Sequence, residues 1–515
     1  MINKSKRWFI LVPIVVVVSL ICLHFWIKNR IVIFLDEIRA PAIILDYDDL
    51  SINLFTGSVF LNNLNIEILD DSLKFIQLSL FSKQMKVKGF RYGSYLTTGH
   101  IDFDEWYFEE PIFIKYEDIV STGMTISDSK VNFDSIPFTL KALNLDNGIV
   151  QLVKGGKDSV QMEVNDLNIS IFNIKGNLKE LIKGVPAQYS EIECTTGYSF
   201  YNFSPNKHIG IDSLSYREGR ITVHTLDYIS NNNNSGLSKV LEDERNQILF
   251  SIPNMSIENF QVNLVNNSFK AEGDKWSINH ASLSMLRNQN VSDKKEPVDL
   301  HITLLRNLPI QIDIDSVYIS EGFIEYSETD SLGNNENRLY FENVNGDINN
   351  LSNTVANNEE TTISASSNFM GHADIRLYWN FYVNNPNDEF SAEGSVFNFR
   401  GESINSFLEP DFKIRGYLSE MYFDLNGDMF TSSGNIKMKY EDFEFLVLKR
   451  DGFRVNSIIS NLGKLFISKN SSVDSLGYRH GNMDIVRDPT HSFFEYLWDN
   501  IEDGIINTIV GNGKE

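Results

Sequence analysis

Three oxygen-bearing side chains, Asp424, Asn426 and Asp428, stand at the first three ligand positions of a calcium-binding loop. Such a loop needs a glycine at its sixth position and a glutamate at its twelfth, but this chain has Met429 and Asn435 there. We therefore expect a polar turn at these residues, and we predict no metal site in the chain.

A second group of carboxylates, Asp102, Asp104 and Glu105, lies among the aromatic residues of the sequence IDFDEWYF. Paired carboxylates can catalyse glycoside hydrolysis, but this alternation is typical of the solvent face of a strand. The sequence has no HExxH, GxSxG, GxGxxG or Walker motif. Its two cysteines, Cys22 and Cys194, cannot form a cysteine zinc site. We predict no catalytic residue, no cofactor and no enzymatic activity.

The elements that would position such groups are predicted by a recurring pattern, apolar-x-apolar-x-x-Gly-x-apolar-x-apolar. Alternation by two places the apolar residues of each arm on one face of a strand. A turn around the glycine keeps both arms on the same face, so each copy predicts a hairpin with one apolar face. The pair Asn147-Gly148 is the strongest of these signals. The copies surround Gly57, Gly99, Gly148, Gly219, Gly322 and Gly434, and two copies without the glycine surround Ser129 and Phe260.

The repeated hairpins and the low proline content, 12 residues in 515, predict a mostly β protein. No segment is rich enough in proline or glycine to be a linker. We therefore expect one elongated domain over residues 29–488, a curved antiparallel sheet that forms a groove with an apolar inner face. The predicted groove residues are Leu145, Val150, Leu214, Tyr216, Ile221, Val317, Ile319, Ile324, Tyr326, Ile436 and Met438.

The net charge of −24 argues against a nucleic-acid partner, because a surface that binds nucleic acid needs a basic stripe. Acidic side chains keep a large β protein soluble and discourage pairing between the edges of its sheets.

The N-terminal sequence predicts a membrane anchor over residues 8–28. Phe9 to Ile27 is nearly all apolar and long enough to span a bilayer. Trp8 and Trp26 flank this run, where interfacial aromatic residues belong. Basic residues within positions 1–7 favour a cytoplasmic tail, although Lys28 weakens the asymmetry of charge. The body of the protein is then expected outside the cytoplasm.

A cleaved signal peptide is the alternative to this anchor. It requires a shorter apolar core and small residues at the cleavage site, whereas the run ends in LHFWI. A lipoprotein signal at Cys22 is disfavoured because Ile21 stands where a small residue is needed.

The last segment, residues 489–511, predicts an amphipathic helix. Its apolar stripe has helical spacing, and its other face is acidic. The helix is expected to pack on the end of the sheet and close an edge. The alternative is docking to a membrane or a partner, although an acidic face weakens binding to anionic lipid. The stripe consists of Phe494, Leu497, Trp498, Ile501 and Ile505.

Parts of the chain resemble AsmA-like proteins of Gram-negative envelopes. The closing region of that family, about residues 395–450 here, is matched by Ile404-Asn405, Pro410, Ile414-Arg415-Gly416, Tyr422-Phe423 and the run GNIKMKYED from Gly434 to Asp442. Its terminal helix resembles FFEYLW from Phe493 to Trp498, followed by Gly504-Ile505. The N-terminal apolar run followed by Leu50-Ser51-Ile52 and Gly57 to Leu61 is also similar.

The resemblance implies a single-pass inner-membrane protein with a cytoplasmic N-terminus and a periplasmic β-groove. It implies a role in outer-membrane maintenance through movement of phospholipid or another acyl-chain lipid, with the inner membrane and envelope proteins as partners. It supplies no catalytic residues. A second hypothesis is an assembly scaffold whose sheet edges pair with outer-membrane proteins. The two differ in whether the apolar face is open along its length or closed as a packed core.

Overall fold

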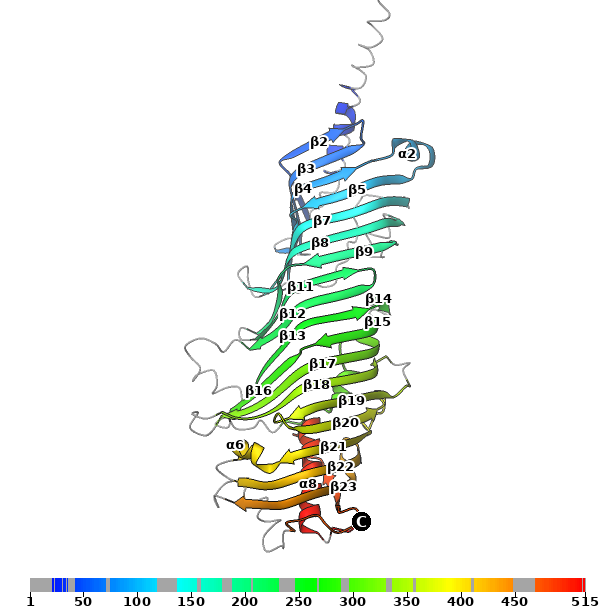
Figure 1. Ribbon diagram of the computed structural model, residues 1–515. Helices are drawn as coiled ribbons and strands as arrows, with labels where there is room; N and C mark the ends of the chain where they lie inside the picture. Colours follow the sequence, from blue (N-terminus) through cyan, green and yellow to red (C-terminus); the bar gives the residue numbers. More distant parts are fainter. Residues whose placement is uncertain are drawn as a thin grey trace, which may run out of the picture. The chain divides into compact units, whose positions relative to one another are not determined.

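The computed structural model describes most of the chain as strands (Figure 1). The chain divides into two compact units. Unit 1 comprises Met1–Ser204 and Ile209–Glu218, and unit 2 comprises Pro205–His208 and Gly219–Glu515. The described residues are 21–22, 24–29, 31–33, 35, 42–70, 75–117, 137–154, 159–177, 188–204, 207–230, 246–265, 268–288, 296–329, 336–354, 358–408, 412–447, 468–511 and 513–514.

Unit 1 is a mixed sheet. Strands β1 and β2 pair with β3, which pairs with β4. β5 and β6 lie between β4 and β7, and β7 pairs with β8. β8 then pairs with β9 and β10, and β9 with β11. The bounds are β1 Ile43–Asp46, β2 Asp49–Asn53, β3 Ser58–Leu69, β4 Ile76–Lys88, β5 Ile101–Glu109, β6 Ile112–Tyr116, β7 Pro137–Val153, β8 Val160–Asn177, β9 Glu191–Thr196, β10 Ser199–Ser204 and β11 Lys207–Arg217.

Parallel pairings in this sheet correct the prediction of a purely antiparallel one. β5 and β6 lie end to end, separated at Pro111, and both are parallel to β7. Pro111 has no N–H to donate to a ladder, which explains the break. The chain from Tyr116 to Pro137 exceeds the dozen residues that a parallel crossover needs. The alternation of apolar residues reports side-chain faces and carries no information about strand direction.

The strands of unit 2 belong to the same mixed sheet and pair in the order β12–β13–β15–β17 and then β18 to β24 in sequence. β14 pairs with β15, and β16 lies between β13 and β17. The bounds are β12 Arg220–Ser230, β13 Asn246–Glu258, β14 Gln261–Val265, β15 Ser268–Asn279, β16 Ser282–Asn288, β17 Gln311–Thr329, β18 Glu336–Ser352, β19 Thr361–Phe369, β20 Ala373–Phe381, β21 Phe390–Arg400, β22 Phe412–Gly427, β23 Thr431–Val447 and β24 Arg479–Val486.

Parallel pairings occur in unit 2 as well. β15 and β16 lie end to end and are both parallel to β17. The connection from β16 to β17 carries the helix α5, His301–Arg306, onto the core described below. The other short helices are α2 Tyr92–Thr98, η1 Gly401–Ile404 and α6 Asn405–Leu408.

Several predicted hairpins are wrong because the strand continues through the expected turn. β7 runs through Asn147-Gly148 and β17 through Gly322, and both show register shifts typical of β-bulges. The residue before the bulge has a positive φ, 55° at Asn147 and 53° at Glu321. At Asn259, with φ 51°, β13 passes into β14 without reversing.

The remaining copies of the pattern have different outcomes. Gly57 lies in a turn between β2 and β3, and Gly219 in a two-residue turn between β11 and β12, as predicted. Gly99 ends the helix α2, and Gly434 lies inside β23, after the turn that joins β22 to β23. The copy around Ser129 falls outside the described residues.

The pattern misleads because a turn and a bulge both keep apolar residues on one face where the apolar alternation changes phase. Val317 and Ile319 alternate in one phase, and Ile324 and Tyr326 alternate in the other. A bulge places one extra residue in a strand, so apolar residues before and after it stay on one face. A hairpin turn achieves the same result by reversing the chain.

The N-terminal residues that are described are helical at 21–22, 24–29, 31–33 and 35. Ile31, Val32 and Leu35 pack against a cluster that includes the buried Leu61 and Leu64 of β3. No helix formed by the described residues is long and apolar enough to cross a membrane. Most of the predicted anchor, with Trp8, lies outside the described residues, whereas Trp26 is helical and exposed.

The C-terminal helix is present as α8, Phe493–Val510, within the predicted range. Ser492 and Glu495 form a capping box, in which the Ser492 hydroxyl accepts from the Glu495 N–H and the Glu495 carboxylate accepts from the Ser492 N–H. At the other end, the buried Arg479 donates to the carbonyls of Thr508 and Gly511. A cation at a helix C-terminus is favourable because carbonyls there lack intrahelical partners.

The bulge in β7 gives the first prediction. Asn147→Gly should leave the urea midpoint unchanged, because glycine adopts a positive φ freely. Asn147→Val should lower stability by about 1–2 kcal/mol, because a β-branched residue is strained there. At an ordinary strand position valine is more favourable than glycine. A higher urea midpoint for Asn147→Val than for Asn147→Gly would therefore contradict the bulge.

Candidate functional site

The apolar residues of unit 1 form rows that run across the sheet. Residues paired across neighbouring strands point to the same face. One such row crosses β3, β4, β5, β7, β8, β9 and β11 without a charged residue. Its members are Leu61, Met85, Phe108, Leu145, Ile169, Cys194 and Tyr216. A neighbouring row contains Val150, paired with Phe113 and Val164.

The opposite face of unit 1 is polar. Displaced by one residue along the strands, a second row runs from Phe60 through Lys86, Tyr107, Asn144 and Ser170 to Glu193. Charged side chains on these strands form ion pairs, such as Lys88 with Glu105 at 2.5 Å. The sheet therefore separates an apolar face from a polar face along its whole width.

Unit 2 repeats this arrangement over more strands. A row from β12 to β24 contains only apolar residues and one glycine: Ile221, Ile257, Trp276, Val317, Ile348, Ile363, Trp379, Ala392, Leu425, Gly434 and Met483. The next row joins Ile319 of β17 to Ile436 of β23 through Gly346, Ala365, Leu377, Gly394 and Phe423.

Seven of the eleven predicted groove residues fall into these rows: Leu145, Val150, Tyr216, Ile221, Val317, Ile319 and Ile436. The burial of the eleven differs. Val317, Ile436 and Met438 are buried, with 2, 2 and 3% exposed. The others are half-buried: Leu145, Val150, Leu214, Tyr216, Ile221, Ile319, Ile324 and Tyr326. Leu214 pairs with Thr196, and Ile324 pairs with Leu283 and Phe341.

A closed core accounts for the burial at the C-terminal end. The helix α8 contacts β23 and β24, and in Figure 1 it lies behind the strands β21 to β23. Tyr496 and Phe493 of the helix pack with Ile436 and Met483 of the sheet in one buried cluster. Gly504 permits this approach, since a Cβ there would stand 2.8 Å from the Met483 side chain. This part of the apolar face is a packed core and not an open groove.

The middle of unit 2 is covered differently. Ile252, Ile278, Ile314 and Val317 are buried among partly buried residues of the strands β12 to β18. Among the described elements, α2 contacts β5, α6 contacts β18 and β22, and α8 contacts β23 and β24. The helix α5 packs on the core that includes Phe381 of β20. Within the described residues, the apolar side chains of β12 to β18 pack on one another.

The buried face of α8 differs from the predicted stripe. Leu497, Ile501 and Ile505 are partly buried against the core, but Phe494 and Trp498 are 67 and 56% exposed. The fully buried positions are Phe493, Tyr496, Asn500, Gly504, Thr508 and Ile509. Apolar periodicity could not reveal this face, because three of its members are polar or glycine. Asn500 is satisfied by the Ser432 hydroxyl, 2.8 Å from its Oδ1.

Helix α8 also protects the edge of β24. The His480 N–H donates to the carbonyl of Gly513, and the Asp484 N–H donates to the Asp503 carboxylate. The Asn482 carbonyl accepts a hydrogen bond of 2.8 Å from the Asn507 side chain. These bonds occupy backbone groups that a further strand would need, so the expectation that the helix closes an edge is confirmed.

A half-buried histidine with two buried ring nitrogens lies where α5 meets α8. The ring of His301 is 4.2 Å from the Phe493 ring and 4.9 Å from the Phe381 ring. Both ring nitrogens, like Trp379 Nε1, are buried without a hydrogen-bond partner among the described residues. Desolvation lowers the pKa of His301 to about 4, although the Asp388 charge acts in the opposite direction. Nothing in the sequence pattern marked this residue.

The carboxylates that could have served in catalysis are held in other contacts. Lys141, 2.6 Å away, lowers the pKa of Asp104, and Lys88 lowers the pKa of Glu105. A general acid needs a raised pKa, so these groups are unsuited to that role. Asp428 accepts from the N–H groups of Phe430 and Thr431 in the turn after β22. The described residues contain no group of three or more potential metal ligands.

Comparison with known proteins matched the chain to no protein family and to no curated protein sequence.

The helix α8 provides the second prediction. Tyr496→Ala should cost about 3 kcal/mol or more, because it removes a fully buried ring from the core. Trp498→Ala, two residues along the helix, should cost less than about 1 kcal/mol, because its ring is exposed. The urea midpoints of the two variants measure this difference, and equal losses would contradict the described face of the helix.

The third prediction concerns pH. The pKa of His301 is about 4 in the folded protein and about 6.5 when unfolded, so the folded state binds fewer protons between these values. Stability should therefore fall as the pH drops from 6.5 towards 4, by about 3 kcal/mol at most. His301→Leu should remove this part of the pH dependence, and His280→Leu, at an exposed site, should keep it. Parallel midpoint–pH curves for wild type and His301→Leu would rule out this assignment.

Proposed function

We propose that this chain is an AsmA-like envelope protein that holds or conducts lipid along the apolar face of its sheet. The observation that carries the proposal is the pair of unbroken apolar rows, one across each unit. An acyl chain needs a continuous apolar path, since burial of apolar area stabilises it by roughly 25 cal/mol per Å². Single-pass anchoring in the inner membrane, with a periplasmic body, is part of this proposal and rests on residues 8–28.

The burial pattern defines which part of the face is suited to lipid. Leu145, Tyr216 and Ile319 are half-buried, as expected for side chains that line a surface without being sealed in a core. Ile436 and Met438, which we predicted as groove residues, lie under α8 and are excluded from this role. Lipid is therefore expected on the strands away from α8.

The scaffold hypothesis receives less support. Strand addition requires an edge with free backbone groups, and three such groups of β24 are occupied by α8 and the residues after it. The edge of β24 is consequently a poor template for a client strand.

The fourth prediction tests the lipid proposal. A photo-crosslinking residue at Leu145 or Ile319 should yield lipid adducts in cells, detected by mass spectrometry. Asn144 and Tyr318, their polar-face neighbours in sequence, should yield none, and neither should Met438 beneath α8. Equal adducts on both faces would contradict a specific path, and no adduct at Leu145 or Ile319 would show that the apolar face is closed to lipid.

A further inference from the structure

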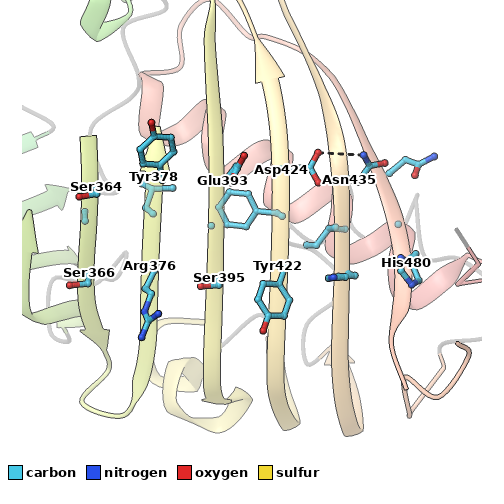
Figure 2. A pocket seen from close by; sticks show the side chains of 18 of the residues that line it. Ser364, Ser366, Arg376, Tyr378, Glu393, Ser395, Tyr422, Asp424, Asn435 and His480 are labelled. Atoms are coloured by element: carbon cyan, nitrogen blue, oxygen red, sulfur yellow. Dashed lines mark hydrogen bonds between the residues drawn. The ribbon is translucent and has the colours of Figure 1, made fainter. Parts of the chain in front are cut away.

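The polar face of unit 2 is hollowed opposite α8. A trough of about 1010 Å³ extends over β18 to β24. Figure 2 shows its side chains in front of the strands, with the C-terminal helix behind them. Seven strands at about 4.8 Å spacing make this trough roughly 29 Å long.

Charges in the trough are sorted into two adjacent rows. Arg376 and Lys437 belong to one row of cross-strand partners. Asp347, Glu393 and Asp424 belong to the next row. Residues of one face repeat every second position, so the two rows are about 7 Å apart. Tyr378 and Tyr422 stand between the charges.

Cations and carboxylates in this trough are not paired with one another. Arg338 and Glu325 are diagonal neighbours on adjacent strands, and they form an ion pair of 3.3 Å. Arg376 and Glu393 have the same diagonal relation, as do Lys437 and Asp424, yet within the described residues no ion pair joins either couple.

The ammonium group of Lys437 contacts tyrosine rings instead of a carboxylate. It lies over the rings of Tyr422 and Tyr478, 5.1 and 5.3 Å from their centroids. The carboxylate of Asp424 accepts a long bond of 3.4 Å from the Asn435 amide. Charged groups that are held by neutral neighbours retain their capacity for charge-assisted hydrogen bonds to a ligand.

The lining determines the class of ligand. The side chains of the two polar rows are charged, amide, hydroxyl and tyrosine groups, whereas the apolar lining residues Ala365, Leu377, Phe423 and Ile436 belong to the apolar row between them in sequence. The length of the trough exceeds a single lipid headgroup and suits an extended polymer. Two rows of opposite charge require both anionic and cationic groups on that polymer, about 7 Å apart.

We propose that the trough binds a zwitterionic glycopeptide, a polymer rich in hydroxyl and amide groups that carries carboxylates and ammonium groups, as in bacterial cell walls. Its carboxylates meet Arg376 and Lys437, and its ammonium groups meet Glu393 and Asp424. The exposed Tyr378 supplies a ring face and a hydroxyl group to the sugar units. The choice of a cell-wall ligand rests on the proposed envelope location, but the site lies on the face opposite the proposed lipid path and shares no side chain with it.

The fifth prediction tests this site. The full chain, purified in detergent, is titrated with muropeptides released from purified peptidoglycan. Arg376→Glu and Glu393→Lys should each weaken binding at least tenfold. Arg220→Glu, which makes the same change of charge as Arg376→Glu on β12, should stay within twofold of wild type. Unchanged melting temperatures verify that the variants fold.

Three outcomes would overturn the proposal. One is the absence of muropeptide binding by the wild-type chain at millimolar concentration, and another is equal affinity of wild type and Arg376→Glu. The third is equal competition by soluble dihexanoyl phosphatidylethanolamine, which would assign the charges to a lipid headgroup. Lipid adducts at Leu145 and Ile319 do not depend on this trough, so its failure is distinguishable from failure of the lipid proposal.

Discussion

The structure depends on one constraint, namely that successive side chains of a strand face opposite sides. A slip of one residue moves every following side chain to the other face. This chain keeps long strands in phase by placing bulges where the alternation slips, as at Asn147 in β7 and Glu321 in β17. The apolar rows and the polar trough of unit 2 both exist because these corrections hold the two faces apart.

The sequence predicted much of this separation, because alternation is a local property. The predicted residues of unit 1 do share a face, as the row containing Leu145 and Tyr216 demonstrates. The connections were not predictable in the same way. At Asn147-Gly148 a bulge and a hairpin turn require the same residue with a positive φ, so the local sequence could not distinguish them.

Long-range features were also hidden from the sequence. The parallel pairing of β15 with β17 follows from a crossover, and alternation does not report strand direction. The helix α5 is only six residues long and lacks a detectable period, yet it brings Ile302 and His301 into the core. For α8 the existence of a helix was predictable from spacing. Its buried face was not, because Asn500, Gly504 and Thr508 carry no apolar signal.

Buried hydrogen bonds fix the position of α8 on the sheet. A helix held only by apolar contacts can slide or rotate over a sheet, since such contacts are non-directional. Asn500 bonds to Ser432, and Arg479 donates to carbonyls at the end of the helix, so one position along the sheet satisfies both. Moving the helix would leave these buried groups unpaired, which costs about 1–3 kcal/mol each. The apolar row that joins Ile319 to Ile436 therefore ends beneath a helix whose position is fixed by these hydrogen bonds. Any lipid on unit 2 must be held on the strands before that point.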